Sequence, residues 1–305
     1  MISDLNLLNN LPSTVDWCEI NYNSSEYIAE FWNTISGIFL VASGLLYYRN
    51  NIDWMKENKR FYINFFRITG LLVFVGVGTS LFHGTLYYPF QLLDELPMVL
   101  LANEYLVLLM SLETTRLSIN SEIISQLNRV LMFTYKMLPF IIISYFITPV
   151  LQVVTFHITL KFSELSVLFV LYKLSKALNQ IVYSKIYITQ DLLRDKSMAS
   201  SIFVYNSFNR KKNNVFKESR LLHIVQNRIR KYLVLRNELK TVTRIGIYVY
   251  TFSIGIWCLE HMFCKYVEPL QFHAIWHIMS SVGVYHLNLI MQLHVSINQF
   301  VFNDE

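Results

Sequence analysis

Residues 63–86 read INFFRITGLLVFVGVGTSLFHGTL, and Arg67 is the only lysine, arginine, aspartate or glutamate among them. About 20 mostly apolar residues are enough for a helix to cross the hydrocarbon core of a membrane. Six more segments have the same character, namely residues 31–48, 91–111, 130–147, 150–181, 242–264 and 272–300. The sequence therefore predicts an all-α integral membrane protein that forms a seven-transmembrane-helix bundle.

The composition agrees with this prediction. Hydrophobic residues make up 53% of the chain and charged residues only 15%, whereas a soluble domain has about 25% charged residues. Residues 1–33 lack the basic region and short apolar core of a cleaved signal peptide, so the first predicted span is expected to direct insertion and to remain as a helix. The span at 150–181 is long for one crossing and is expected to tilt or to extend beyond the bilayer.

Positive charge is distributed very unevenly between the two sides of such a bundle. The connections after the first, third and fifth spans carry twenty lysine and arginine residues, and those on the other side carry one, Lys265. The positive-inside rule therefore predicts a lumenal N-terminus and a cytosolic C-terminus. It divides the chain into a lumenal segment, 1–30, and a membrane domain, 31–300, with a basic cytosolic loop at 184–241. That loop is either solvated or bound to anionic lipid.

Ionisable side chains gather near the predicted lumenal ends of three spans. His273 and His277 are four residues apart and so lie on one helix face, and His83 and Asp94 fall at a similar depth. A catalytic zinc ion is usually held by three protein ligands, such as histidines, with a fourth position left open. A nearby carboxylate can take a proton from water bound there. A hydrogen-bonded pair or a proton relay would use the same residues.

The lumenal segment is acidic as well. DWCEIN, at Asp16–Asn21, is followed by Glu30, and no lysine or arginine precedes Arg49. Closely spaced oxygen atoms of this kind suit a hard cation such as Ca²⁺, although the residues alone favour an acidic segment without a ligand. Cys18 and Cys264 both fall on the lumenal side, where disulfides persist, whereas Cys258 is expected to be a buried thiol.

Five stretches together resemble the alkaline ceramidase family, part of a superfamily of seven-transmembrane zinc hydrolases that includes the adiponectin receptors. They are DWCEINY (16–22), YIAEFWNT (27–34), LFHGTL (81–86), QLLDELPM (91–98) and QFHAIWHI (271–278). The fungal alkaline ceramidases are the most similar in overall character. The resemblance implies hydrolysis of the amide bond of ceramide, dihydroceramide or phytoceramide to a sphingoid base and a fatty acid. It also implies residence in the endoplasmic reticulum or Golgi, with membrane lipids as surroundings and no nucleic acid partner.

The resemblance also implies a role for each matching residue. Zinc would be held by His83, His273 and His277, and Asp94 would act as the acid and base. Calcium would be held by Asp16, Glu19, Asn21, Glu30 and the carbonyl of Trp17, and Cys18 would pair with Cys264.

The family usually has a serine one turn before its first zinc histidine. This chain has Thr79 there, with Ser80 next to it, so Thr79 is expected to take the role of the serine and Ser80 is the second candidate. Two other classes of function remain open from the residues alone: a lipid-sensing receptor with a structural metal, and a proton-coupled transporter.

Overall fold

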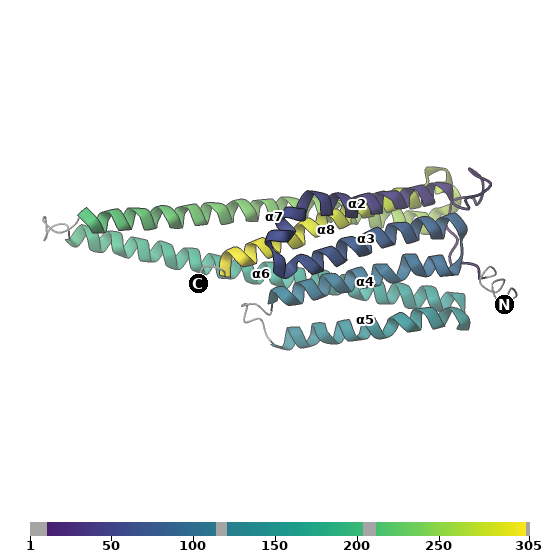
Figure 1. The fold of residues 1–305 in the computed structure, drawn as a ribbon, viewed down its shortest axis with the longest axis horizontal. Helices are drawn as coiled ribbons and strands as arrows, with labels where there is room; N and C mark the ends of the chain where they lie inside the picture. Colours follow the sequence, from purple (N-terminus) through teal and green to yellow (C-terminus); the bar gives the residue numbers. More distant parts are fainter. Residues whose placement is uncertain (1–10, 114–120, 204–211, 303–305) are drawn as a thin grey trace. The chain divides into compact units, whose positions relative to one another are not determined.

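The computed structural model describes residues 11–113, 121–203 and 212–302 (Figure 1). Within these ranges the chain forms seven long α-helices and no strand, which confirms the predicted all-α bundle. The helices are α2 (Phe31–Glu57), α3 (Lys59–Thr85), α4 (Tyr88–Glu113), α5 (Ser121–Ile147), α6 (Pro149–Phe203), α7 (Lys212–Val267) and α8 (Phe272–Phe302), and a short 3-10 turn, η1 (Glu268–Leu270), precedes α8.

Six of the described helices, α2 to α7, are long and apolar enough to cross a membrane. The seventh, α8, has 31 residues and includes four histidines, and it is not one of these six. Large apolar side chains such as Phe74, Phe146 and Val150 are well exposed on the outer faces. Contiguous apolar surface of this kind marks contact with lipid, so the chain is a multi-pass membrane protein.

The connection between the fifth and sixth spans differs from the expected loop. Helix α6 continues to Phe203 and α7 begins at Lys212, so the prediction of a loop over residues 184–241 is wrong for most of that length. Polar composition excludes these residues from the hydrocarbon core, but lysine, arginine, glutamate and leucine are all good helix formers. A polar segment is therefore free to continue a membrane helix into water.

The chain divides into two compact units. The first comprises Met1–Val170 and Thr243–Leu289, and the second comprises Leu171–Val242 and Ile290–Glu305. In the second unit the hydroxyl of Ser175 lies 2.8 Å from Nε2 of His294. The predicted site residues all belong to the first unit, in which α2 packs on α3, α3 on α4 and α4 on α5.

Small residues let the helices of the first unit approach closely. A methyl group on Gly37 would lie 2.8 Å from the carbonyl oxygen of Gly76, and one on Gly78 would lie 2.2 Å from the carbonyl oxygen of Leu93. Small residues at helix contacts are typical of membrane bundles, because packing replaces the hydrophobic effect as the main attraction. The close approach at Gly78 brings the end of α3 against the start of α4.

A buried polar network holds the start of α4. Gln91 donates to Glu95 Oε1 over 2.7 Å and to the Thr14 hydroxyl over 2.6 Å, and Gln152 of α6 donates to the other oxygen of Glu95. Thr14 in turn donates to Gln152 over 2.7 Å. The network ties α4, α6 and the N-terminal segment together one residue away from Asp94.

Candidate metal centre

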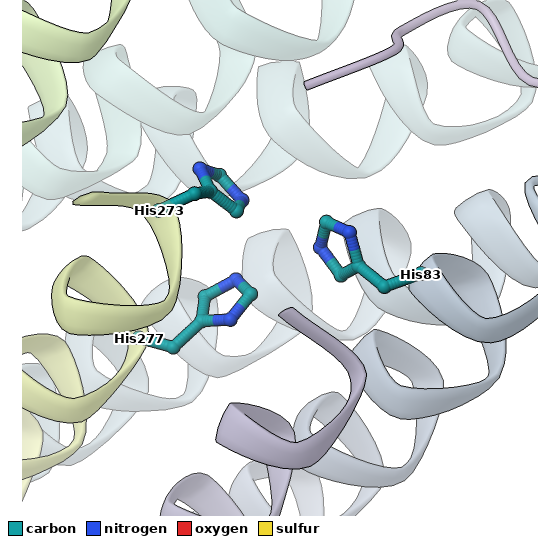
Figure 2. Close-up of side chains that lie close together, drawn as sticks. All are labelled: His83, His273 and His277. Carbon is teal, nitrogen blue, oxygen red and sulfur yellow. The ribbon is translucent and has the colours of Figure 1, made fainter. Parts of the chain in front are cut away.

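Three histidines from two helices meet at one end of the first unit. His83 lies two residues before the end of α3, and His273 and His277 lie on the first two turns of α8. Figure 2 shows their rings directed toward one another from facing helices. One ligand atom from each lies within 4.8 Å of the other two, and the residues are only 1–3% exposed.

Local backbone features set the ends of both helices. Leu86 closes α3 in the left-handed conformation, with φ 52°, and donates its N–H to the carbonyl of Phe82. Gln271 adopts the same conformation directly before α8 begins. Because non-glycine residues rarely adopt positive φ, these two turns fix where each histidine-bearing helix ends or begins.

Each histidine has a hydrogen-bond partner on its Nδ1 atom. His83 Nδ1 contacts Oε2 of Glu30, and His273 Nδ1 lies 3.0 Å from Oε2 of Glu260. A carboxylate can only accept, so both Nδ1 atoms carry the proton. Nε2 of each ring is therefore left with a lone pair.

The third histidine, His277, has a serine hydroxyl as the partner of its Nδ1 atom. His277 Nδ1 lies 2.6 Å from the hydroxyl of Ser36, which donates its own proton to the carbonyl of Asn33 over 2.7 Å. The histidine must then donate, and its Nε2 carries a lone pair as well. Three buried imidazoles whose Nδ1 atoms already have partners leave their Nε2 atoms as the candidate ligands of a transition metal.

The arrangement fits zinc in size. Nitrogen ligands about 2.1 Å from a tetrahedral zinc ion lie about 3.4 Å apart, so small side-chain movements from separations within 4.8 Å complete the site. Partners on the distal nitrogen of metal-binding histidines are the usual way to fix their orientation. Glu30, Ser36 and Glu260 supply all three partners here.

Ser36 and Glu260 were missed in the sequence, and the contact of Glu30 with His83 was not foreseen. Glu260 could have been found, because it is an ionisable residue inside the predicted span 242–264 and such residues are rarely without a function. Ser36 gives no comparable signal, since serine is common in membrane helices.

Asp94 lies beside the histidines on α4. Its Oδ1 atom is 2.5 Å from the hydroxyl of Thr79, which also lies 2.9 Å from the carbonyl of Val75 one turn earlier on α3. The structure thus brings Thr79 and Asp94 together. It does not bring Ser80 to them, because the Ser80 hydroxyl donates to the carbonyl of Thr34 on α2.

Exchange of Gly78 for alanine should separate Thr79 from Asp94. The added methyl group would overlap the carbonyl of Leu93 at 2.2 Å, and overpacking of this kind typically costs about 1–3 kcal/mol. We expect the activity of the protein to fall at least about tenfold, since even about 1 Å of misplacement is costly in a catalytic group. Gly70→Ala on the same helix is the matched control, because nothing lies within 4 Å of its added methyl group. Equal behaviour of the two variants would contradict the importance of this contact.

The acidic N-terminal segment lies next to the histidines. Glu30 accepts the N–H of Trp17 at Oε1 over 3.0 Å while its other oxygen contacts His83. The amide of Asn21 donates to Asp16 over 3.1 Å, and its buried Oδ1 atom has no partner among the described residues. An unpaired amide oxygen beside carboxylates, with no basic residue before Arg49, fits a hard cation.

Glu19 has a structural task in the same segment. Its two carboxylate oxygens accept the backbone N–H groups of Trp32 and Asn33 over 2.8 and 2.9 Å, and so cap the positive end of α2. Desolvation raises the pKa of the Glu19 carboxyl, and the charge of Glu30 adds to the rise, although the two N–H groups offset part of it. Glu19 therefore starts to take up protons at a higher pH than an exposed glutamate does.

A disulfide and a stacked ring close this end of the protein. Cys18 is joined to Cys264 with a Cα–Cα distance of 5.3 Å, and Cys258 is a free thiol. The ring of Trp17 stacks on that of His273, with centroids 3.7 Å apart. The N-terminal segment is thus fixed to α7 by a covalent bond and lies directly against one of the three histidines.

Comparison with known proteins identifies relatives along most of the chain. The model of a family described as Ceramidase matches residues 9–301. Alkaline ceramidase 3 of Mus musculus is 24% identical over 294 residues, which cover 92% of this chain and 83% of the mouse protein. Alkaline ceramidase YPC1 of Saccharomyces cerevisiae is 47% identical over 91 residues, 28% of this chain and 26% of the yeast protein. An alkaline ceramidase of Arabidopsis thaliana is 41% identical over 92 residues, 29% of this chain and 33% of its own length.

Proposed function

The chain belongs to the ceramidase family and hydrolyses the amide bond of ceramide, and we propose that it does so with a zinc ion held by His83, His273 and His277. The single observation that supports this metal site best is the meeting of three buried histidines, each of which offers a ligand atom within 4.8 Å of the other two and has a hydrogen-bond partner on Nδ1. The match over residues 9–301 favours the enzyme over the receptor and transporter interpretations. Zinc in this site would acidify a water molecule and polarise the amide carbonyl of the substrate.

Asp94 is the acid and base of the proposed reaction. Its carboxylate accepts a proton from the water whose oxygen attacks the carbonyl carbon. The same proton then goes to the amide nitrogen as the C–N bond breaks, so that the products are a fatty acid and a sphingoid base. A positioned carboxylate of this kind contributes about 10²–10⁴ to the rate.

Thr79 has two tasks in this proposal. Before substrate binds, its hydroxyl donates to Asp94 or to the carbonyl of Val75, and the bond to Asp94 holds that carboxylate in place. When the carbonyl oxygen gains negative charge, the hydroxyl can donate to it instead. Ser80 serves packing between α2 and α3, since its hydroxyl is occupied by Thr34.

Removal of the Thr79 hydroxyl should slow hydrolysis more than removal of its methyl group. Thr79→Val keeps the shape and loses the donor, and loss of one donor to a developing oxyanion typically costs about 10²–10³ in kcat. Thr79→Ser keeps the donor and should retain most of the activity. The measurement is kcat for ceramide in detergent micelles. A valine variant as active as the serine variant would exclude this role.

The metal proposal is tested on one purified sample by measuring zinc content and ceramide hydrolysis together. A strong chelator should remove both, and added zinc should restore both in proportion. Hydrolysis that persists in protein free of zinc would refute the zinc site but not the membership of the family.

Calcium is the proposed occupant of the acidic segment, with ligands from Asp16, Trp17, Glu19, Asn21 and Glu30. Glu30 connects the proposed calcium and zinc sites. One of its carboxylate oxygens accepts the N–H of Trp17 in the acidic segment, and the other contacts His83. A cation bound there would hold Glu30, and through it the ring of His83.

Calcium removal should therefore lower hydrolysis several-fold without loss of zinc. The affinity for calcium should also decrease as the pH is lowered, and the decrease should begin at a higher pH than for an exposed glutamate, because protons compete for Glu19, whose pKa is raised by burial. Titration with calcium at each pH gives the affinity. Glu19→Gln should weaken binding, and Glu26→Gln, at an exposed glutamate of the same segment, is the control. Affinity that does not change with pH would contradict a role for Glu19.

The N-terminal segment is proposed to face the lumen of the endoplasmic reticulum or Golgi, with the C-terminus in the cytosol. The charge asymmetry of the connections and the Cys18–Cys264 disulfide support this orientation. A tag at each terminus, probed with protease in sealed microsomes, tests it. Assays of ceramide, dihydroceramide and phytoceramide would then establish which sphingoid base is preferred.

A further inference from the structure

Glu260 is a buried carboxylate for which the reaction described above has no use. It lies in α7 within a membrane-spanning segment and is 1% exposed. A charged group in such a place is costly unless it is paired. Its Oε2 atom lies 3.0 Å from Nδ1 of His273, and no lysine or arginine forms a salt bridge with it among the described residues.

Neighbouring residues restrict the movement of the Glu260 and His273 side chains. The ring of Trp17 covers one face of the His273 ring, so the imidazole cannot turn freely. Cys264 follows Glu260 by four residues, just past a kink of α7 at Phe263, and is fixed to Cys18 by the disulfide. The chain directly after Glu260 is therefore anchored to the segment that carries Trp17.

The three histidines differ in the charge of their partners. His83 and His273 each face a carboxylate, from Glu30 and Glu260, whereas His277 faces the neutral hydroxyl of Ser36. Two carboxylates balance the double charge of a zinc ion in an apolar bundle. Glu30 is shared with the acidic segment and Asp94 is the proposed acid and base, which leaves Glu260 as the carboxylate whose only partner among the described side chains is a histidine of the site.

We propose that Glu260 is a positioning residue that holds His273 with Nε2 toward the metal and adds a negative charge behind that imidazole. This inference rests on the proposed zinc site. The carboxylate acts through the imidazole and touches neither substrate nor water, so its effect is on metal affinity. Loss of such a partner typically lowers metal affinity about 10–100-fold.

The test is the zinc affinity of the purified full-length protein, measured by competition with a chelator of known affinity. Glu260→Gln keeps the size and one acceptor oxygen but loses the charge, and Glu260→Ala loses both. We expect about tenfold weaker binding for the glutamine variant and up to about 100-fold for the alanine variant. Glu164→Gln is the matched control, since this membrane glutamate of α6 is hydrogen-bonded to Lys161 and Tyr250 and to none of the three histidines of the site.

A second measurement separates positioning from catalysis. At saturating zinc, the Glu260→Gln protein should recover a kcat per bound zinc close to that of the unmodified protein. Wild-type zinc affinity in both Glu260 variants would overturn the proposal, and so would a kcat that stays low when the site is full. Neither result contradicts the zinc site itself, which is tested separately by the zinc binding of His83→Ala and His273→Ala.

Discussion

His83→Ala should reduce ceramide hydrolysis to the background rate and remove the bound zinc. Of the three proposed ligands, His83 alone comes from α3, so its loss leaves only the pair from α8. A catalytic zinc site usually needs three protein ligands, and two histidines are too few. Without the metal, the attacking water returns from a pKa near 7 to about 15.7, and we expect a loss of at least about 10³-fold.

The matched control for this variant is His286→Ala. His286 lies on α8, where it is half-buried and its Nδ1 atom is hydrogen-bonded to the carbonyl of Val282, outside the cluster of three histidines. Both variants should be compared by zinc content, hydrolysis and thermal unfolding. A His83→Ala protein that folds, lacks zinc and still hydrolyses ceramide would show that the histidines serve structure only.

Asp94→Asn should also lose hydrolysis, but this variant should retain its zinc. The amide has the shape of the carboxylate and can still accept from Thr79, which lies 2.5 Å away. It cannot take a proton from water or return one to nitrogen. The expected decrease in kcat is therefore about 10²–10⁴-fold, the usual contribution of a positioned acid and base.

Glu104→Gln, on the same helix, is the control for Asp94→Asn. Its carboxylate lies 3.9 Å from Arg67 and far along α4 from the histidines, so activity should change little. An Asp94→Asn protein with normal kcat would exclude Asp94 as the base. A protein that has lost zinc as well would instead make Asp94 a ligand.

Composition and periodicity were sufficient for the membrane bundle. The span predicted at 63–86 is α3, Lys59–Thr85, because an apolar run of that length has few other solutions in lipid. The ends were less certain, as polar residues near Lys59 and beyond Ile181 continue the helices that the apolar runs begin. The hydropathy of the sequence indicates where the chain leaves the bilayer, but the helix can continue beyond that point.

The candidate site was only partly visible in the sequence. The spacing of His273 and His277 and the common depth of His83 and Asp94 brought the four residues together in advance. Their partners could not be found in this way, since Ser36 and His277 are 241 positions apart and only the packing of α2 against α8 makes them neighbours. The role of Gly78 was also hidden, because it depends on the carbonyl of Leu93 on another helix.

The Cys18–Cys264 disulfide joins residues separated by 246 positions. At a synthesis rate of about 5–20 residues per second, the second cysteine leaves the ribosome roughly 12–50 s after the first. Cys18 therefore waits as a free thiol while five helices are inserted, and His273 and His277 follow Cys264 by only a few residues. The proposed metal site cannot form until almost the whole polypeptide has been made, so on this proposal a ribosome that stalls before α8 leaves behind an inert bundle and not an uncontrolled lipid hydrolase.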